Sequence, residues 1–329
     1  MGLMLFALCF GVRAQGNEFN STGFEAISFT SQTCSGFFGT STWRCEETRV
    51  PAYMLKAKDR RAVVFISHGS QGLDKRHGDY AKALVESGIT AVVLGHWQAR
   101  GLGPIQMNYD SGRNAGGNTT SQVIDVLSAA TQLKETAEFK DARMGQIGES
   151  MGGSTALNLT RPYLRRAFNE IYGKPPVELS ALVALYPGCF DHFSNEAFRP
   201  TPLLFIVGSE DDDTPAADCI EQVPYIKSRG GNASIIVLQG EGHDFDAPFR
   251  QQRSKLAQNP QKCWNNRDGD TFILRASGKK YPGTVEGYNA LMKDCIAMTW
   301  AKPTVGYRES PRTGYKEWTA YLRRELLDE

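Results

Sequence analysis

A serine placed on a sharp turn is the first candidate for chemistry. Gly148-Glu-Ser-Met-Gly152 has the G-x-S-x-G pattern and stands between a strand-like run at 143–147 and a stretch of helical spacing at 154–168. In such a strand-to-helix turn a side chain at either glycine would clash, and the strained backbone lifts the Ser150 hydroxyl above the sheet. The following helix points its N–H groups and positive dipole end at the same place, which suits an oxyanion. An inactive glycine-rich loop produces the same pattern, so other residues must decide.

The sequence also supplies a base and a carboxylate in the required order. A serine hydroxyl is a good nucleophile at neutral pH only when a base takes its proton, and the base needs a carboxylate that orients it. With the G-x-S-x-G turn the chain order is serine, then Asp or Glu, then His, the last two in loops after later strands. Here an acidic loop at 208–215 follows one apolar run, and His243 follows the next run at 234–238. We predict that His243 is the base of a Ser-His-Asp triad.

Three consecutive aspartates compete for the role of the orienting carboxylate. We assign it to Asp211, which stands in a loop closed by Thr214-Pro215. Asp212 and Asp213 are the alternatives for this role. An acidic loop is also a common N-cap of the following helix, which is the second interpretation of these two residues.

A second glycine-rich loop is the candidate for an oxyanion donor. An apolar run at 62–67 is followed by His68-Gly-Ser-Gln-Gly72. The oxyanion hole of a G-x-S-x-G enzyme takes one N–H from the residue after the serine and another from a loop after an earlier strand. We therefore predict that the N–H of Met151 and that of Ser70 or Gln71 hold the oxyanion.

Short apolar runs alternate with helical stretches along most of the chain. This alternation predicts an α/β fold with a mostly parallel, twisted sheet covered by helices on both faces. Two antiparallel edge strands are expected at 24–30 and 48–56, and a closing helix at 318–327. The other expected strands are 62–67, 90–94, 143–147, 179–186, 203–207 and 233–238, and the expected helices are 80–87, 121–138, 154–168 and 216–228.

Over about residues 48–250 the chain resembles the α/β-hydrolases, and among them the dienelactone hydrolase-like family. The resemblance implies the α/β-hydrolase fold and hydrolysis of an ester or lactone without a cofactor, with Ser150, Asp211 and His243 matching the triad. Dienelactone hydrolase itself uses a cysteine nucleophile, so Ser150 favours a general serine carboxylesterase. The matching stretches are 63–72, 148–153, 186–189, 208–219 and 242–248.

Charge and hydropathy argue against two other classes of protein. The 37 Lys and Arg residues nearly equal the 36 Asp and Glu residues, whereas a nucleic-acid binder usually has a basic excess gathered into one stripe. The longest apolar run, 3–12, is shorter than the about 18 residues that span a bilayer, so no transmembrane helix is expected. The expected partner is a small-molecule ester or lactone, and the oligomeric state stays open.

The same apolar run is typical of a secretory signal. Val12-Arg-Ala14 matches a small-residue cleavage site, so we predict a signal peptide at 1–14, with a buried first helix as the alternative. Residues 15–329 are expected to form a single α/β-hydrolase domain with a C-terminal extension from about 247. The protein is then secreted or periplasmic rather than cytoplasmic.

The cysteines agree with an oxidising compartment. One of the seven, Cys9, lies in the predicted signal, and the other six form no CxxC pair that would favour zinc. We predict disulfides between neighbours in the sequence, with buried free thiols as the alternative. The predicted pairs are Cys34 with Cys45, Cys189 with Cys219, and Cys263 with Cys295.

The substrate pocket is expected above the same edge of the sheet, near Trp97, Arg100, Tyr109 and Arg113. One hypothesis is that Arg100 or Arg113 binds a substrate carboxylate through two hydrogen bonds. We prefer the interpretation that both arginines attach a long loop to the scaffold.

These features together predict a serine hydrolase that cleaves a carboxylic ester or a lactone through an acyl-enzyme. The alternatives are a serine peptidase with the same triad and a catalytically silent binding protein built on the same fold.

Overall fold

The computed structural model of the chain describes residues 17–35, 43–103, 116–193, 197–253, 262–268, 271–297 and 303–328. The predicted signal peptide, Tyr109 and Arg113 lie outside these ranges. Within them, no helix combines the length and the apolar character needed to cross a membrane.

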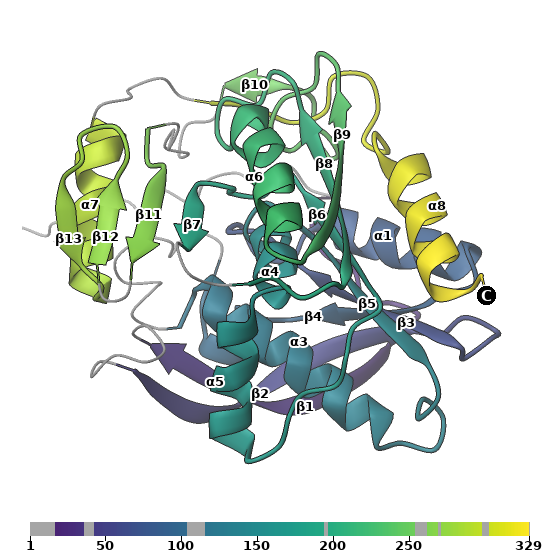
Figure 1. Cartoon of the computed structure of the whole chain (residues 1–329). Helices are drawn as coiled ribbons and strands as arrows, with labels where there is room; N and C mark the ends of the chain where they lie inside the picture. The colour runs from purple at the N-terminus through teal and green to yellow at the C-terminus, as the bar shows by residue number, and fades with distance from the viewer. Residues whose placement is uncertain are drawn as a thin grey trace, which may run out of the picture.

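An eight-stranded sheet forms the centre of the molecule (Figure 1). The strand order is β1-β2-β4-β3-β5-β6-β8-β9. β1 and β2 are antiparallel to each other. The remaining six strands, β4, β3, β5, β6, β8 and β9, are parallel to one another. The predicted mostly parallel sheet is therefore confirmed. β2 is not an edge strand as expected, because its second side pairs with β4. The strands are β1 Glu25–Ser35, β2 Arg44–Leu55, β3 Ala62–Ser67, β4 Thr90–Leu94, β5 Arg143–Glu149, β6 Ala181–Leu185, β8 Pro202–Gly208 and β9 Asn232–Leu238.

The solid apolar runs become strands that are covered on both faces. β3, β4 and β6 are buried at every residue. Alternate side chains of β3 enter opposite cores: Val63 and Phe65 pack on the side of α3 to α6, and Val64 and Ile66 pack on the side of α1 and α8. The helices are α1 Lys75–Glu86, the 3-10 turn η1 Gln98–Arg100, α3 Thr119–Lys134, α4 Met151–Leu159, α5 Pro162–Tyr172, α6 Ala216–Ser228 and α8 Tyr315–Leu326.

The single helix expected at 154–168 is two helices, α4 and α5. α4 ends at Leu159 and α5 begins at Pro162. Proline lacks the N–H that would continue a helix, but its fixed φ suits the first position of a new one. α4 also begins earlier than expected, at Met151, so its N-terminus lies directly behind Ser150.

The C-terminal extension has two parts. Most of it forms a small unit with its own apolar cluster, a four-stranded sheet in the order β13-β12-β11-β7 and the helix α7, seen beside the main sheet in Figure 1. β7 comes from the loop after β6 and pairs in parallel with β11. α8, the expected closing helix, instead returns to the main sheet and buries Trp318 there. The remaining elements are β7 Asp191–Phe193, β10 Gln252–Arg253, β11 Asn265–Asp268, β12 Thr271–Leu274, β13 Lys280–Pro282, α7 Val285–Ala297 and β14 Thr304–Val305.

The predicted cysteine pairs are bonded in the structure. The first joins β1 to β2, the second joins the loop after β6 to α6, and the third closes the small C-terminal unit. These disulfides agree with an oxidising compartment. The bonded pairs are Cys34–Cys45, Cys189–Cys219 and Cys263–Cys295.

Candidate active site

Ser150 lies between β5 and α4, at the carboxyl end of the strand. Its φ of 51° and ψ of −112° fall in a region that non-glycine residues rarely adopt. A Cβ atom on Gly148 would overlap the carbonyl of Gly152, and a Cβ atom on Gly152 would overlap the carbonyl of Ser67. The two glycines of the pattern are therefore required by the close packing of the turn, as the motif predicts.

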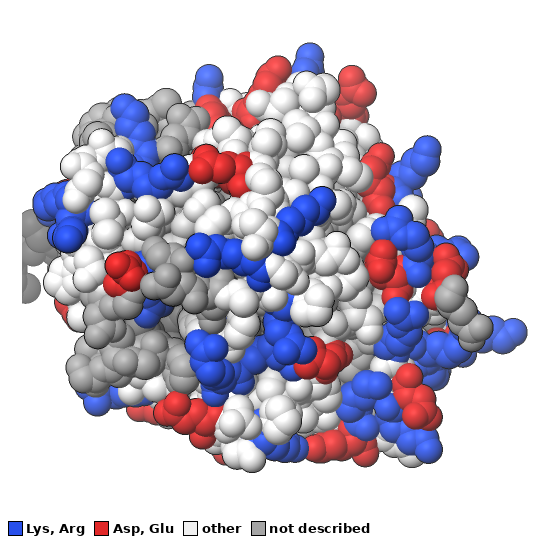
Figure 2. All heavy atoms as spheres, viewed as in Figure 1, with Lys and Arg blue, Asp and Glu red and all other residues white. Residues whose placement is uncertain are grey.

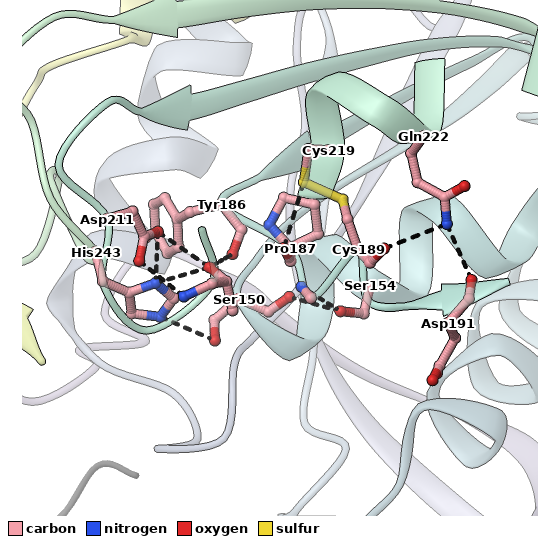
Figure 3. Close-up of a disulfide and its surroundings, with 12 residues drawn as sticks. Ser150, Ser154, Tyr186, Pro187, Cys189, Asp191, Asp211, Cys219, Gln222 and His243 are labelled. Carbon is pink, nitrogen blue, oxygen red and sulfur yellow. Dashed lines mark hydrogen bonds and ion pairs between the residues drawn. A yellow bond between two sulfur atoms is a disulfide. The ribbon is translucent and has the colours of Figure 1, made fainter. Parts of the chain in front are cut away.

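His243 connects Ser150 to Asp211 (Figure 3). Its Nε2 lies 3.2 Å from Ser150 Oγ, and its Nδ1 lies 2.9 Å from Asp211 Oδ2. With the ring proton on Nδ1, the imidazole donates to the carboxylate and accepts from the serine hydroxyl, which is the resting arrangement of a triad. The structure thus brings the three predicted residues together.

The carboxylate of Asp211 is held in place by its own loop. Its Oδ1 accepts the backbone N–H groups of Asp213 and Thr214, at 2.9 and 2.8 Å. The hydroxyl of Thr214 lies 3.0 Å from Asp211 Oδ2 and 3.1 Å from His243 Nδ1. These contacts fix the carboxylate on the Nδ1 side of the ring, so Asp211 has the geometry of the orienting residue.

The two neighbouring aspartates face other partners. Asp212 accepts from Arg253 Nη1 at 2.9 Å and from the N–H of Thr304 at 2.7 Å, so it attaches the C-terminal extension to the acid loop. Asp213 lies on the far side of the imidazole, with Oδ2 3.6 Å from Nε2. The N-cap interpretation of both residues is wrong, because the N-cap position of α6 is Pro215.

The charges around His243 favour its protonated form. Burial by itself lowers the pKa of His243, but the carboxylates of Asp211 and Asp213 outweigh burial and raise this pKa to about 10. Burial raises the pKa of Asp213 to about 7; His243 opposes this shift, and the charge of Asp211 adds to it. The site therefore stabilises an imidazolium, the form that a triad histidine takes in the transition state.

The loop with the predicted second oxyanion donor lies against the nucleophile turn. Glu149 Oε1 accepts the N–H of Gly69 at 2.5 Å, so the side chain next to the nucleophile anchors this loop. A Cβ atom on Gly69 would overlap the Glu149 carboxylate, which explains the glycine. The carbonyl of Ser70 accepts from Trp97 Nε1 at 3.0 Å. The loop is thus attached on both sides.

The oxyanion donors themselves stay predictions that rest on this placement. Met151 is the first residue of α4, and the first N–H groups of a helix have no partner within it. Gln71 is exposed and Ser70 is partly exposed, so the loop reaches solvent beside the turn.

Two residues expected to line the pocket are buried in the scaffold. The Arg100 side chain is 1% exposed, and its guanidinium donates to both oxygens of Asp125 and to the carbonyls of Gln32 and His96. It has no free face for a substrate carboxylate, so the clamp hypothesis is wrong for this arginine and the scaffold interpretation holds. Trp97 is also buried and supports the oxyanion loop. The described ranges contain no group of three His, Cys, Asp or Glu side chains placed to hold a metal ion.

A second Ser–His–Asp set lies beneath the site, and sequence reasoning missed it. His96 Nε2 is 3.2 Å from Ser67 Oγ, and His96 Nδ1 is 2.7 Å from Asp125 Oδ2. All three residues have no exposed surface, and Asp125 is also paired with Arg100. A substrate has no access to Ser67, so this set joins β3, the loop after β4, and α3 rather than forming a second site.

A buried ionic network behind His243 was also missed. Arg76 Nη1, from α1, donates to Asp244 Oδ1 at 2.7 Å and to Tyr186 Oη at 3.0 Å. The Tyr186 hydroxyl donates in turn to Asp246, and the Tyr186 ring packs edge-on against the imidazole. Tyr186 and Asp244 both have positive φ, so the network holds two strained residues around the base. The only signal in the sequence is the pair of aspartates that follows the histidine.

The mostly parallel sheet carries the nucleophile turn after β5, the acid loop after β8 and the histidine loop after β9. The side chains from these three connections are hydrogen-bonded to one another. The chain has the α/β-hydrolase fold. No protein-family model matches the chain, and no curated protein sequence matches it.

Solved structures described as an esterase and as a dienelactone hydrolase are similar to the chain at low identity. Esterase 2 of Thermogutta terrifontis with bound propionate is 14% identical, with a TM-score of 0.48 over 69% of this chain and 86% of that one. The same esterase phosphorylated by paraoxon is 15% identical, with a TM-score of 0.49 over 70% and 88%. A protein described as a dienelactone hydrolase from Klebsiella pneumoniae is 16% identical, with a TM-score of 0.44 over 69% and 90%.

Proposed function

We propose that this protein is a serine hydrolase that cleaves a carboxylic ester or a lactone through an acyl-enzyme. The observation that carries the proposal is the unbroken series of hydrogen bonds from Ser150 through His243 to Asp211. The serine lies on a strained turn at the carboxyl end of β5. A histidine so placed takes the serine proton, and the carboxylate stabilises the imidazolium that forms.

The reaction takes place in two halves. In the first, His243 removes the Ser150 proton, the oxygen attacks the carbonyl carbon, and the N–H groups of Met151 and of Ser70 or Gln71 stabilise the oxyanion. The imidazolium then gives its proton to the leaving alkoxide, which departs as an alcohol or, in a lactone, stays on the acyl chain. In the second half His243 takes a proton from water, which attacks the acyl-enzyme and restores the serine.

Two wider features support a small-molecule substrate and an extracytoplasmic location. On the face shown in Figure 2, Lys and Arg side chains are interspersed with Asp and Glu side chains, unlike the basic stripe of a nucleic-acid binder. The three disulfides favour a secreted or periplasmic protein.

A fluorophosphonate probe tests the proposal, because it reacts with activated serines. We expect one probe adduct by intact mass on the wild-type protein, no adduct on Ser150→Ala, and an adduct on Ser67→Ala at the wild-type rate. Ser67→Ala is the matched control, since it removes the serine of the buried set.

A panel of aryl esters, lactones and dipeptides then identifies the bond that is cleaved. We expect turnover of esters or lactones. Cleavage of the dipeptides alone would favour a peptidase, and absence of the adduct on folded wild-type protein would favour the silent binding protein.

A further inference from the structure

Asp213 places a second carboxylate on the reactive side of the imidazole. Its Oδ2 lies 3.6 Å from His243 Nε2, the nitrogen that faces Ser150 Oγ at 3.2 Å. A triad needs one carboxylate, on Nδ1, and Asp211 occupies that position. Nε2 is the atom through which the proton passes from the serine to the leaving group. A negative charge beside it therefore acts directly on the transferred proton.

The position of Asp213 is fixed by the acid loop. Its backbone N–H donates to Asp211 Oδ1, so the carboxylate that orients the ring also sets the turn that carries Asp213 to the ring's other side. The Asp213 side chain is 18% exposed, which weakens solvent screening of its interaction with the imidazole.

The remaining charged groups around His243 lie elsewhere. Asp244, the next residue, is paired with the Arg76 guanidinium at 2.7 Å. After β6 the neighbour is the ring of Tyr186, and in the nucleophile turn it is the Ser150 hydroxyl. After β14 the contact is a backbone bond from the Gly306 N–H to the His243 carbonyl. Thus the carboxylate facing Nε2 comes from Asp213.

We propose that Asp213 sets the pH range in which His243 works as a base, by holding a proton on Nε2 until the pH is high enough to remove it. This proposal rests on the proposed hydrolase function of the same site. The direction of the pKa shifts agrees with it, because Asp213 is one of the groups that raise the pKa of His243. An ionised Asp213 also stabilises the imidazolium during catalysis, so it raises the rate above the pKa of His243, about 10. It lowers the rate between that pKa and its own pKa, about 7, because there it is charged and keeps His243 protonated.

Asp213→Asn tests this role, because it removes the charge and keeps the shape. An opposite charge within about 4 to 6 Å shifts a pKa by about 1 to 3 units, so we expect the pKa of His243 to fall by that amount. The acid limb of kcat/KM then moves to lower pH by the same amount, and the plateau at high pH is lower than in the wild type. The two profiles cross, and the variant is the more active enzyme between about pH 7, where Asp213 of the wild type becomes charged, and the pKa of wild-type His243.

Asp212→Asn is the matched control, since Asp212 belongs to the same loop but pairs with Arg253. It should leave both the pKa of His243 and the acid limb in place. Circular dichroism and thermal melting check that each variant is folded, and Asp213→Ser provides a second neutral variant.

Nuclear magnetic resonance titration of the imidazole measures the pKa of His243 without any substrate, with the signal assigned by its loss in His243→Gln. An unchanged pKa in folded Asp213→Asn would overturn the proposal, and so would an equal loss of activity at every pH, which indicates a purely structural role. The titration also separates the two proposals: a shifted pKa in a protein that cleaves no ester supports Asp213 and contradicts the hydrolase function.

Discussion

Ser67 and Ser150 each lie within hydrogen-bond distance of a histidine that contacts an aspartate. They differ in their surroundings. Ser150 has a strained backbone at the end of a strand, whereas Ser67 is buried inside the scaffold. The buried aspartate is shared with Arg100, whereas the described partners of Asp211 are backbone N–H groups, the Thr214 hydroxyl and the imidazole. Exposure and strain at the serine therefore distinguish a nucleophile from a structural hydrogen bond.

Glu149 is a positioning residue at the same scale. We expect Glu149→Ala to lower kcat by about 10-fold to 100-fold with little change in KM, because the oxyanion loop loses its anchor at Gly69. This loss is smaller than the 10²-fold to 10³-fold typical of deleting an oxyanion donor outright. Steady-state kinetics on the best ester of the panel measures the effect.

Glu149→Gln is the control for this prediction, since an amide oxygen still accepts the Gly69 N–H. It should keep most of the activity. An equal loss in both variants would mean that the charge of Glu149, and not its anchoring of the loop, matters for turnover.

At the scale of elements, one arginine joins α1 to the histidine loop. Arg76 is buried, and besides its bonds to Asp244 and Tyr186 it pairs with Asp74 at the start of its own helix. Since α1 covers one face of the sheet and the histidine loop follows β9, these contacts hold the base at a fixed height above the sheet edge.

We expect Arg76→Met to lower the free energy of unfolding by about 3–5 kcal/mol, because it leaves buried carboxylates without their cation. Urea denaturation measures this change. The double variant Arg76→Met with Asp244→Asn should recover part of it, since one unpaired charge is then removed. If the single variant is as stable as the wild type, the network does not hold the histidine loop.

The elements also define what the sequence can predict. The strands were predictable because β3, β4 and β6 are short, mostly apolar runs, and the three triad residues because each lies in the turn or loop that follows a strand. The break between α4 and α5 has one local signal, Pro162, because helical spacing continues on both sides of it. Partners such as Arg76 and Asp244 are 168 residues apart, and no local pattern links them. Only the packing of elements shows that Arg100 faces Asp125 and not a substrate.

At the scale of the whole molecule, buried histidines make stability depend on pH. His77 lies between Asp74 and Glu149, at 3.2 and 3.4 Å. Burial lowers its pKa, but these two carboxylates outweigh burial and raise the pKa to about 9. The stabilisation is fully present below the unfolded value of about 6.5 and is lost as the pH rises through about 9. His243, with its pKa raised to about 10, acts in the same direction.

We therefore expect Tm to fall between pH 6.5 and pH 10, with His77 contributing about 3 kcal/mol of the lost stability. Differential scanning fluorimetry across this range measures the fall. In His77→Gln the fall should be shallower, because one of the groups that titrate in this range is gone. A wild-type Tm that stays constant or rises over this range would contradict the assignment.

The course of the chain at β7 has a practical consequence for recombinant work. These three residues belong by sequence to the link between β6 and β8, yet their hydrogen bonds complete the sheet of the C-terminal unit. Downstream of that unit, Trp318 still fills the core beneath the sheet. A shortened clone that stops after β9 would therefore expose an unpaired strand on one side and an uncovered apolar face on the other. Expression boundaries for a soluble fragment must extend past Leu326, and an affinity tag is best fused beyond that point.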